Sequence, residues 1–168
     1  VQPDAARLTG GPLVVPKDGA AIVQRISPGP AVVRGLEFSV PRDQAIQLGR
    51  AWLRITWDDR SQPSILAPVA LFFGAGTLYN RDDREYLVKA FPIHVRFQAG
   101  RVLLGCYFPM PFFRSANIEL VGNGETEISD VRWSLCHEPY TDSPNHAAYF
   151  HATHHDFPTP EPGHDMVA

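Results

Sequence analysis

Apolar and polar residues alternate with a period of two over several short stretches of this chain. Leu53, Ile55 and Trp57, for example, share one face of a predicted strand over residues 52–57. This period is typical of a strand with one buried face, because successive side chains of a strand point to opposite sides. The other predicted strands cover residues 20–26, 32–40, 65–70, 93–98, 102–108, 116–121 and 130–135.

Helical periodicity is nearly absent, and the short charged segment 80–87 is the only helix that we predict. Sixteen prolines and thirteen glycines, spread along 168 residues, separate the strands. Many short strands between such turns predict an all-β fold, an antiparallel jelly-roll sandwich over residues 1–138. Residues 139–168 are rich in His, Pro, Asp and Thr without alternation, and we interpret them as an extended arm or linker.

The segment 106–120 contains a corner in which two prolines bracket a methionine. Pro109 and Pro111 exclude a helix and a regular central strand, because each lacks an N–H and restricts the residue before it. We therefore predict that one strand ends, a rigid extended corner follows, and a second strand begins at residue 116. Such a corner suits a preorganised contact surface, with a packed sandwich corner as the alternative.

Composition narrows the classes of partner. A net charge of −3 argues against a nucleic-acid surface, and no apolar run approaches the ~20 residues that span a bilayer. The chain opens at Val1 without an initiator methionine, which suggests a trimmed or processed start and leaves the compartment open, with the cytoplasm slightly favoured. Cys106 and Cys136 are too few for a disulfide scaffold, and we expect free thiols.

Two kinds of side-chain cluster are candidates for chemistry. The histidine-rich C-terminal region suggests a metal site, but its spacing matches no known ligand signature and adjacent histidines point apart, so we expect no metal and no cofactor. That region contains His146, His151, His154, His155, Asp156 and His164. The loop pairs 58–59 and 82–83 are interpreted as solvated turn carboxylates, and Glu119 as part of an ion pair. These residues alone make no complete active site.

A set of motifs in fixed order nevertheless resembles a known family. The motifs are Leu53-Arg54-Ile55-Thr56-Trp57-Asp58, Pro63-Ser64-Ile65, Pro68-Val69, Phe72-Phe73-Gly74, Met110-Pro111-Phe112, Glu119-Leu120, Tyr149-Phe150-His151-Ala152 and Pro162-Gly163-His164-Asp165. From about residue 29 onward the chain is similar to glycoside hydrolase family 172. The resemblance implies tandem jelly rolls, trimers or hexamers, and retaining cleavage or rearrangement of D-fructofuranosides or D-arabinofuranosides.

In that family the glutamate nucleophile and the glutamate acid/base lie in Gly-rich motifs of the second jelly roll, and neither motif occurs in this sequence. The resemblance thus implies an N-terminal jelly roll that ends where the second would begin. One departure is Leu71, which precedes Phe72-Phe73-Gly74 where family members carry an acidic residue. We therefore carry over no catalytic residue.

We expect this jelly roll to supply the wall of a sugar pocket and a subunit interface. The predicted substrate-binding residues are Phe72, Phe73, Tyr107, Met110, Phe112, Arg114 and His151. Aromatic faces stack on sugar rings, and a guanidinium donates a pair of hydrogen bonds. Core packing is the alternative for the phenylalanines, and for Arg114 an ion pair with Glu119 or a neighbouring chain. The alternative functions are a non-catalytic structural or carbohydrate-binding oligomer and a metal-dependent cupin-like enzyme.

Overall fold

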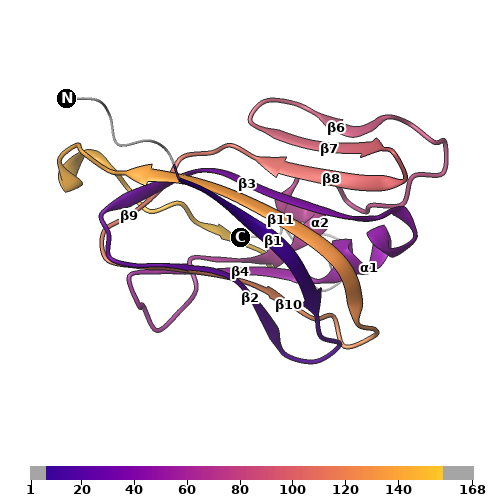
Figure 1. Ribbon diagram of the computed structural model, residues 1–168, viewed down its shortest axis with the longest axis horizontal. Coiled ribbons are helices and arrows are strands. Elements are labelled where there is room, and N and C mark those ends of the chain that lie inside the picture. Colours follow the sequence, from indigo (N-terminus) through magenta and orange to yellow (C-terminus); the bar gives the residue numbers. More distant parts are fainter. Residues whose placement is uncertain (1–6, 157–168) are drawn as a thin grey trace, which may run out of the picture.

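The computed structural model describes residues 7–156 and shows a sandwich of two β-sheets with a few short helices. In Figure 1 the sheets form two layers, with β1, β3 and β11 crossing above β2, β4 and β10. The larger sheet has the order β1-β11-β3-β8-β7-β6, with β9 also paired to β3, and the smaller has the order β12-β5-β4-β10-β2. The predicted all-β sandwich is thereby confirmed.

The strands of the larger sheet are β1 (Arg7–Val15), β3 (Ala31–Pro41), β6 (Tyr86–Lys89), β7 (Ile93–Gln98), β8 (Arg101–Cys106), β9 (Met110–Phe112) and β11 (Ile128–Pro139). Those of the smaller sheet are β2 (Ala20–Ile26), β4 (Trp52–Trp57), β5 (Ile65–Pro68), β10 (Ala116–Val121) and β12 (Ala152–Thr153). The helical elements are η1 (Arg42–Gln44), α1 (Ala45–Arg50), α2 (Val69–Phe72) and η2 (Pro144–His146). No helix among the described residues is long and apolar enough to cross a membrane.

The alternating residues of β4 build the middle of the core. Leu53, Ile55 and Trp57 are all 0% exposed and face the larger sheet. The Trp57 ring lies parallel to Phe112 of β9, with 6.0 Å between ring centroids and 2° between planes. This pair joins the two sheets through apolar contact, which is the main source of stability in such a sandwich.

The structure corrects several element predictions. Residues 80–85 form a loop and β6 follows, so the predicted helix over residues 80–87 is wrong. The Asn80 side chain closes this loop by donating to the carbonyl of Arg84 (2.7 Å) and accepting from its N–H (3.0 Å). Asp83, with φ of 51°, then excludes helical continuation.

Other boundaries also shift. The strand predicted over residues 65–70 ends at Pro68, with α2 beginning at the next residue, and the strand predicted over 102–108 ends at Cys106. The corner contains the short strand β9, in which Pro111 lies opposite Val32 of β3. A proline fits there because β9 is paired on one side only, and only alternate N–H groups are needed. Strand β1 and helix α1 were not predicted.

Tyr149, Phe150 and Ala152, in the segment after β11, pack against the core of the sandwich. Strand β12 lies parallel to β5, with Ala152 opposite Ile65. The Trp57 indole N–H donates to the carbonyl of Phe150 at 3.0 Å, which ties this segment to the core. Both cysteines are free thiols, as predicted, with Cys106 buried and Cys136 half-buried. The domain boundary after residue 138 stays a prediction.

Candidate functional site

Four of the seven predicted substrate-binding residues lie in the core. Phe73, Met110 and Phe112 are 0% exposed, and Phe72 is 9% exposed. Phe73 packs edge-on against both Phe38 and Phe72, with centroid distances of 6.1 and 5.1 Å. Other aromatic rings pack against the three phenylalanines, as in the core-packing alternative expected for them, and the sugar-binding role of the four residues stays a prediction.

The other three predicted residues reach the surface at different places. Tyr107 follows β8 and is half-buried, Arg114 is exposed after β9, and His151 is exposed just before β12. The structure therefore does not bring the seven residues together in one surface. It builds a site around Arg114 from residues that were not predicted to bind substrate.

That site, the corner cluster, consists of Asp58, Arg60, Phe113, Arg114 and Tyr149. Asp58 is 5% exposed and lies just after β4. Its Oδ1 atom accepts the backbone N–H groups of Phe113 (3.0 Å), Arg114 (2.6 Å) and Ser115 (3.0 Å), and its Oδ2 atom accepts the Tyr149 hydroxyl. Consecutive N–H groups around a carboxylate form an anion-binding nest. The nest holds the corner rigid.

These contacts decide the charge of Asp58. Burial alone would raise the pKa of this carboxyl, but the hydrogen bonds from Tyr149 and from the Arg114, Ser115 and Phe113 N–H groups outweigh burial and lower the pKa. The same hydrogen bond, from the Tyr149 hydroxyl to the Asp58 carboxylate, has the opposite effect on its donor and raises the pKa of Tyr149. Asp58 thus stays ionised with its lone pairs occupied, and it is suited to positioning the corner rather than to proton transfer.

Arg114 projects from this rigid corner. Its guanidinium donates through Nη2 to the Asp58 carbonyl, and the rest of the side chain is exposed. The Arg60 guanidinium lies 3.9 Å from the centroid of the Tyr149 ring, and the Phe113 ring meets the same ring edge-on at 5.3 Å. Two guanidinium groups beside half-buried aromatic rings can bind a ligand that has both hydroxyl groups and apolar C–H faces.

The corner corrects two interpretations made from the sequence. Arg114 does not pair with Glu119, because Glu119 binds Arg54 of the neighbouring strand at 2.8 Å. Asp58 is not a solvated turn residue, although Asp59 beside it is exposed. Both have positive φ, of 56° and 55°, and it is this backbone bend that turns Asp58 inward. The sequence shows only two adjacent acids, so it carried no signal for the difference.

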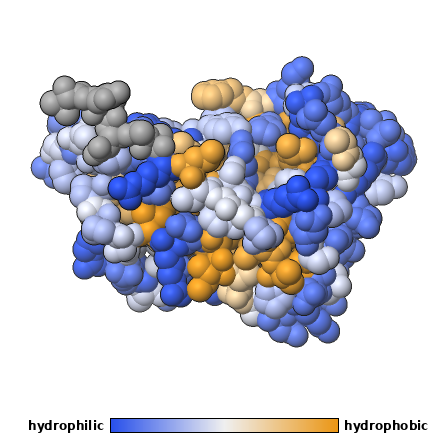
Figure 2. All heavy atoms as spheres, viewed as in Figure 1, coloured by the Kyte–Doolittle hydropathy of each residue, from blue (hydrophilic) through white to orange (hydrophobic). Residues whose placement is uncertain are grey.

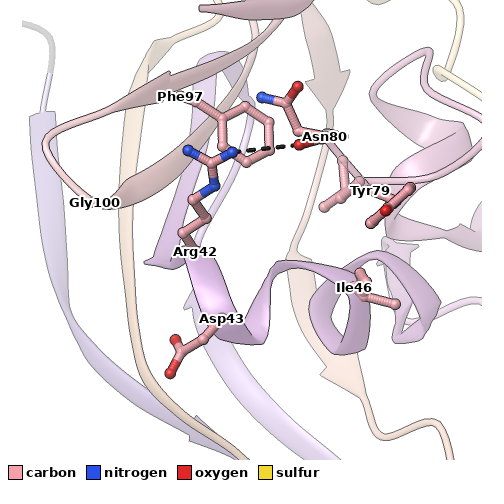
Figure 3. Close-up of a pocket in the computed structure, with 8 residues that line it drawn as sticks. Arg42, Asp43, Ile46, Tyr79, Asn80, Phe97 and Gly100 are labelled. Atoms are coloured by element: carbon pink, nitrogen blue, oxygen red, sulfur yellow. Dashed lines mark hydrogen bonds between the residues drawn. The ribbon is translucent and has the colours of Figure 1, made fainter. Parts of the chain in front are cut away.

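A hollow of about 580 Å³ lies near the end of β3, away from the corner cluster. It is lined by Arg42, Asp43, Ile46, Leu78, Tyr79, Asn80, Phe97 and Gly100. Figure 3 shows the Arg42 guanidinium beside the Phe97 ring and hydrogen-bonded to the backbone oxygen of Asn80, at 3.3 Å. Arg42 also pairs with Asp83, so its charge serves to hold the loop 80–85 in place.

Another hollow, of about 200 Å³, lies between α2, the start of β7 and the segment that carries β12, and it is mostly apolar. Phe72 reaches it with Phe108 and Phe150, whose rings lie 5.4 Å apart. Apolar side chains also come to the surface elsewhere: Figure 2 shows them in the lower part of the view, where β2 and β10 lie. Such patches suit protein contacts more than sugar hydroxyls.

The candidate metal ligands are not brought together. Among residues 7–156 no group of three or more His, Cys, Asp or Glu side chains is placed to hold an ion. His154 lies against the Trp52 ring at 5.9 Å, and His146, His151 and His155 are exposed. His164 lies outside the described residues. The cupin-like alternative therefore gains no support from the described part of the chain.

The fold and the corner cluster together define the class of protein: a β-sandwich domain with a rigid, aromatic and cationic surface corner. Residues 13–135 match the family described as GH172 domain-like, and the chain belongs to this family. The match covers most of both sheets and relates the protein to carbohydrate-active enzymes. Comparison with curated proteins gave no match.

Proposed function

We propose that this chain is the N-terminal jelly-roll part of a retaining glycoside hydrolase that acts on D-fructofuranosides or D-arabinofuranosides. Its role is to supply a wall of the sugar pocket and a subunit interface, while the catalytic glutamates come from outside these residues. The proposal rests on the corner cluster, together with the membership of the chain in the GH172 domain-like family. The rigid nest around Asp58 presents Arg114 with little conformational entropy left to lose on binding.

The arrangement of acidic residues supports the second part of the proposal. Retaining glycosidases need two carboxyl groups about 5–5.5 Å apart. Glu37 and Glu119 alternate with buried neighbours, so they lie on the outer faces of different sheets, with the core between them. Asp58 has its lone pairs occupied. These three carboxylates therefore form no such pair.

Substitution of Arg114 tests the role of the corner. Arg114→Ala should weaken binding of methyl α-D-arabinofuranoside or methyl β-D-fructofuranoside by about tenfold, or weaken self-association, because a charged donor is lost. The melting temperature should change little, since the side chain is exposed. Arg81→Ala is the matched control, because Arg81 is also exposed and, among residues 7–156, pairs only with its neighbour Asp82. A lower melting temperature with unchanged binding and association would show that Arg114 is merely structural.

Activity measurements test the placement of the catalytic groups. We expect no turnover of a nitrophenyl arabinofuranoside by this chain alone. Measurable turnover that survives purification to constant specific activity would overturn the claim that the glutamates lie elsewhere. Restored turnover on adding a polypeptide that carries the Gly-rich glutamate motifs would support it.

A second candidate function, a non-catalytic structural or carbohydrate-binding oligomer, is favoured by the sheet edges. Strands β1 and β2 are edge strands, and they expose Leu8 (75%), Val14 (51%) and Ile22 (45%). Unpaired apolar edges favour association with another chain. Sedimentation velocity distinguishes the states: a trimer or hexamer fits both candidates, and a sharp monomer of 18.6 kDa contradicts the interface role.

A further inference from the structure

The outer face of the larger sheet carries two aromatic rings that lie flat on glycine. Gly105 of β8 lies opposite His94 of β7, and a Cβ atom at residue 105 would overlap the His94 ring, with Nδ1 only 2.7 Å away. Gly35 of β3 lies under Tyr107, since a Cβ there would be 3.4 Å from Cδ1 of that ring. The His94 ring can lie on the sheet only because residue 105 has no side chain, whereas a Cβ at residue 35 would make an ordinary contact with the Tyr107 ring.

The two rings form one floor. Their centroids are 5.8 Å apart and their planes differ by 25°. Strands β8 and β3, which carry the two glycines, are neighbours in the sheet, and neighbouring strands lie about 4.8 Å apart. The two rings therefore lie nearly parallel, as an offset pair over neighbouring strands. The result is a nearly flat, weakly polar floor.

Polar groups stand along one side of the floor. Glu37 of β3 accepts the Tyr107 hydroxyl (2.5 Å) with one carboxylate oxygen and the Ser134 hydroxyl (2.7 Å) with the other. These bonds fix both oxygens, and each keeps a lone pair for another donor. Burial and the bond to Glu37 raise the pKa of Tyr107 to about 12, so its hydroxyl stays a donor at neutral pH. Arg132 of β11 is exposed and lies two residues before Ser134. It is paired with Ser39 of β3.

A cleft of about 170 Å³ lies beside this floor. Glu37, Ser39, His94, Leu103, Arg132 and Ser134 are among its lining residues. The volume is below the range of drug-sized pockets, about 300–1,000 Å³, and suits a single ring. A ligand that fits needs an apolar face for the floor and hydroxyl groups for the carboxylate and the guanidinium. A sugar ring has both.

We propose that this cleft, with the His94–Tyr107 floor, binds one sugar unit of a saccharide chain. The C–H face of the sugar lies on the His94 ring, which lines the cleft, and extends over the Tyr107 ring beside it. Glu37 accepts from the hydroxyl groups of the sugar, and Arg132 donates to them. The inference rests on the carbohydrate relation in the proposed function but not on the corner cluster, which is built from other residues. The site adds affinity for a polymer through a second point of attachment.

Saturation-transfer difference NMR and calorimetric titration test the site. The probes are methyl β-D-fructofuranoside, methyl α-D-arabinofuranoside and methyl α-D-glucopyranoside, each up to about 10 mM, above the millimolar Kd of a weak single-ring site. We expect the strongest saturation on the C–H protons of one sugar face. Tyr107→Ala and His94→Ala should each weaken binding by about tenfold, whereas Tyr107→Phe, which keeps the ring, should weaken it by less than about threefold.

The controls separate this site from the other hollows. Arg114→Ala at the corner cluster and Asp43→Ala at the pocket of Figure 3 should leave binding in the cleft unchanged. Circular dichroism melting shows that each variant is folded. The inference is overturned if no probe binds the parent, if folded Tyr107→Ala binds as well as the parent, or if Arg114→Ala alone abolishes binding. The last result would leave the proposed function standing.

Discussion

Replacement of Asp58 by alanine is the sharpest test of how the corner cluster is held. The change removes the acceptor of three backbone N–H groups and of the Tyr149 hydroxyl. A buried donor that loses its partner costs about 1–3 kcal/mol, and water can reach part of this corner, so the expected total is about 3–4 kcal/mol. Alanine at a φ of 56° adds about 1 kcal/mol, because aspartate tolerates the left-handed region better.

Asp59 provides a matched control one residue away. It is also an aspartate with a positive φ, of 55°, but it is exposed, and its carboxylate makes no hydrogen bond within the described residues. Asp59→Ala should therefore cost only the backbone term, about 1 kcal/mol. Asp58→Asn keeps one oxygen for the three N–H groups and loses the charge, so we expect an intermediate loss of about 1–2 kcal/mol.

Urea unfolding followed by tryptophan fluorescence measures these differences. With a slope of about 2 kcal/mol per M, Asp58→Ala should lower the unfolding midpoint by about 2 M and Asp59→Ala by about 0.5 M. Equal midpoints for the two alanine variants would refute the reasoning, because they would show that the nest around Asp58 contributes nothing beyond backbone conformation. A change in slope would indicate instead a change in the unfolded state.

Three further predictions concern pH, the C-terminal segment and the thiols. Burial, and then the charge of Arg7, lower the pKa of His137, so the stability of the fold should fall as the pH drops below 6.5, the ordinary pKa of histidine. His137→Gln should flatten this part of the profile of melting temperature against pH. Trp57→Phe keeps the stacking on Phe112 but loses the hydrogen bond to the Phe150 carbonyl. It should speed hydrogen exchange at the amides of Ala152 and His154, which bond to the carbonyls of Ser64 and Leu66. Unchanged exchange would contradict the idea that Trp57 holds this segment in place. Burial raises the pKa of the Cys106 thiol, so Ellman's reagent should modify Cys136 first and Cys106 only on unfolding; simultaneous modification would argue against the buried position.

The proposals themselves are separable by single substitutions. Arg114 belongs to the corner cluster, and Tyr107 belongs to the aromatic floor beside the cleft on the larger sheet. Loss of sugar binding in only one of the two variants therefore assigns the binding to one surface. A partial deficit in both variants is expected if both proposals hold, because each surface then binds a sugar unit.

The sequence by itself determined the class of fold, because strand alternation is a local property. The residues that alternate in β4 are those that are buried, since a period of two puts every second side chain on the same face. The motifs in fixed order indicated the family for the same reason, because each motif is a local feature of the sequence. Local patterns did not determine η1, α1 and α2, which are too short for a helical period, or β9, which forms only because β3 lies beside it.

Only the tertiary structure decided which side chains are exposed and which groups meet. The sequence favoured Phe73, Met110 and Phe112 as ligand contacts, yet a sandwich needs large apolar side chains between its sheets, and these fill that space. Asp58, Tyr149 and the corner at Arg114 are up to 91 residues apart in the chain, and no local pattern records that they touch. The same holds for the glycines under His94 and Tyr107. In the sequence each is an ordinary strand glycine, and only the tertiary structure shows that a ring from a residue outside its own strand lies over it.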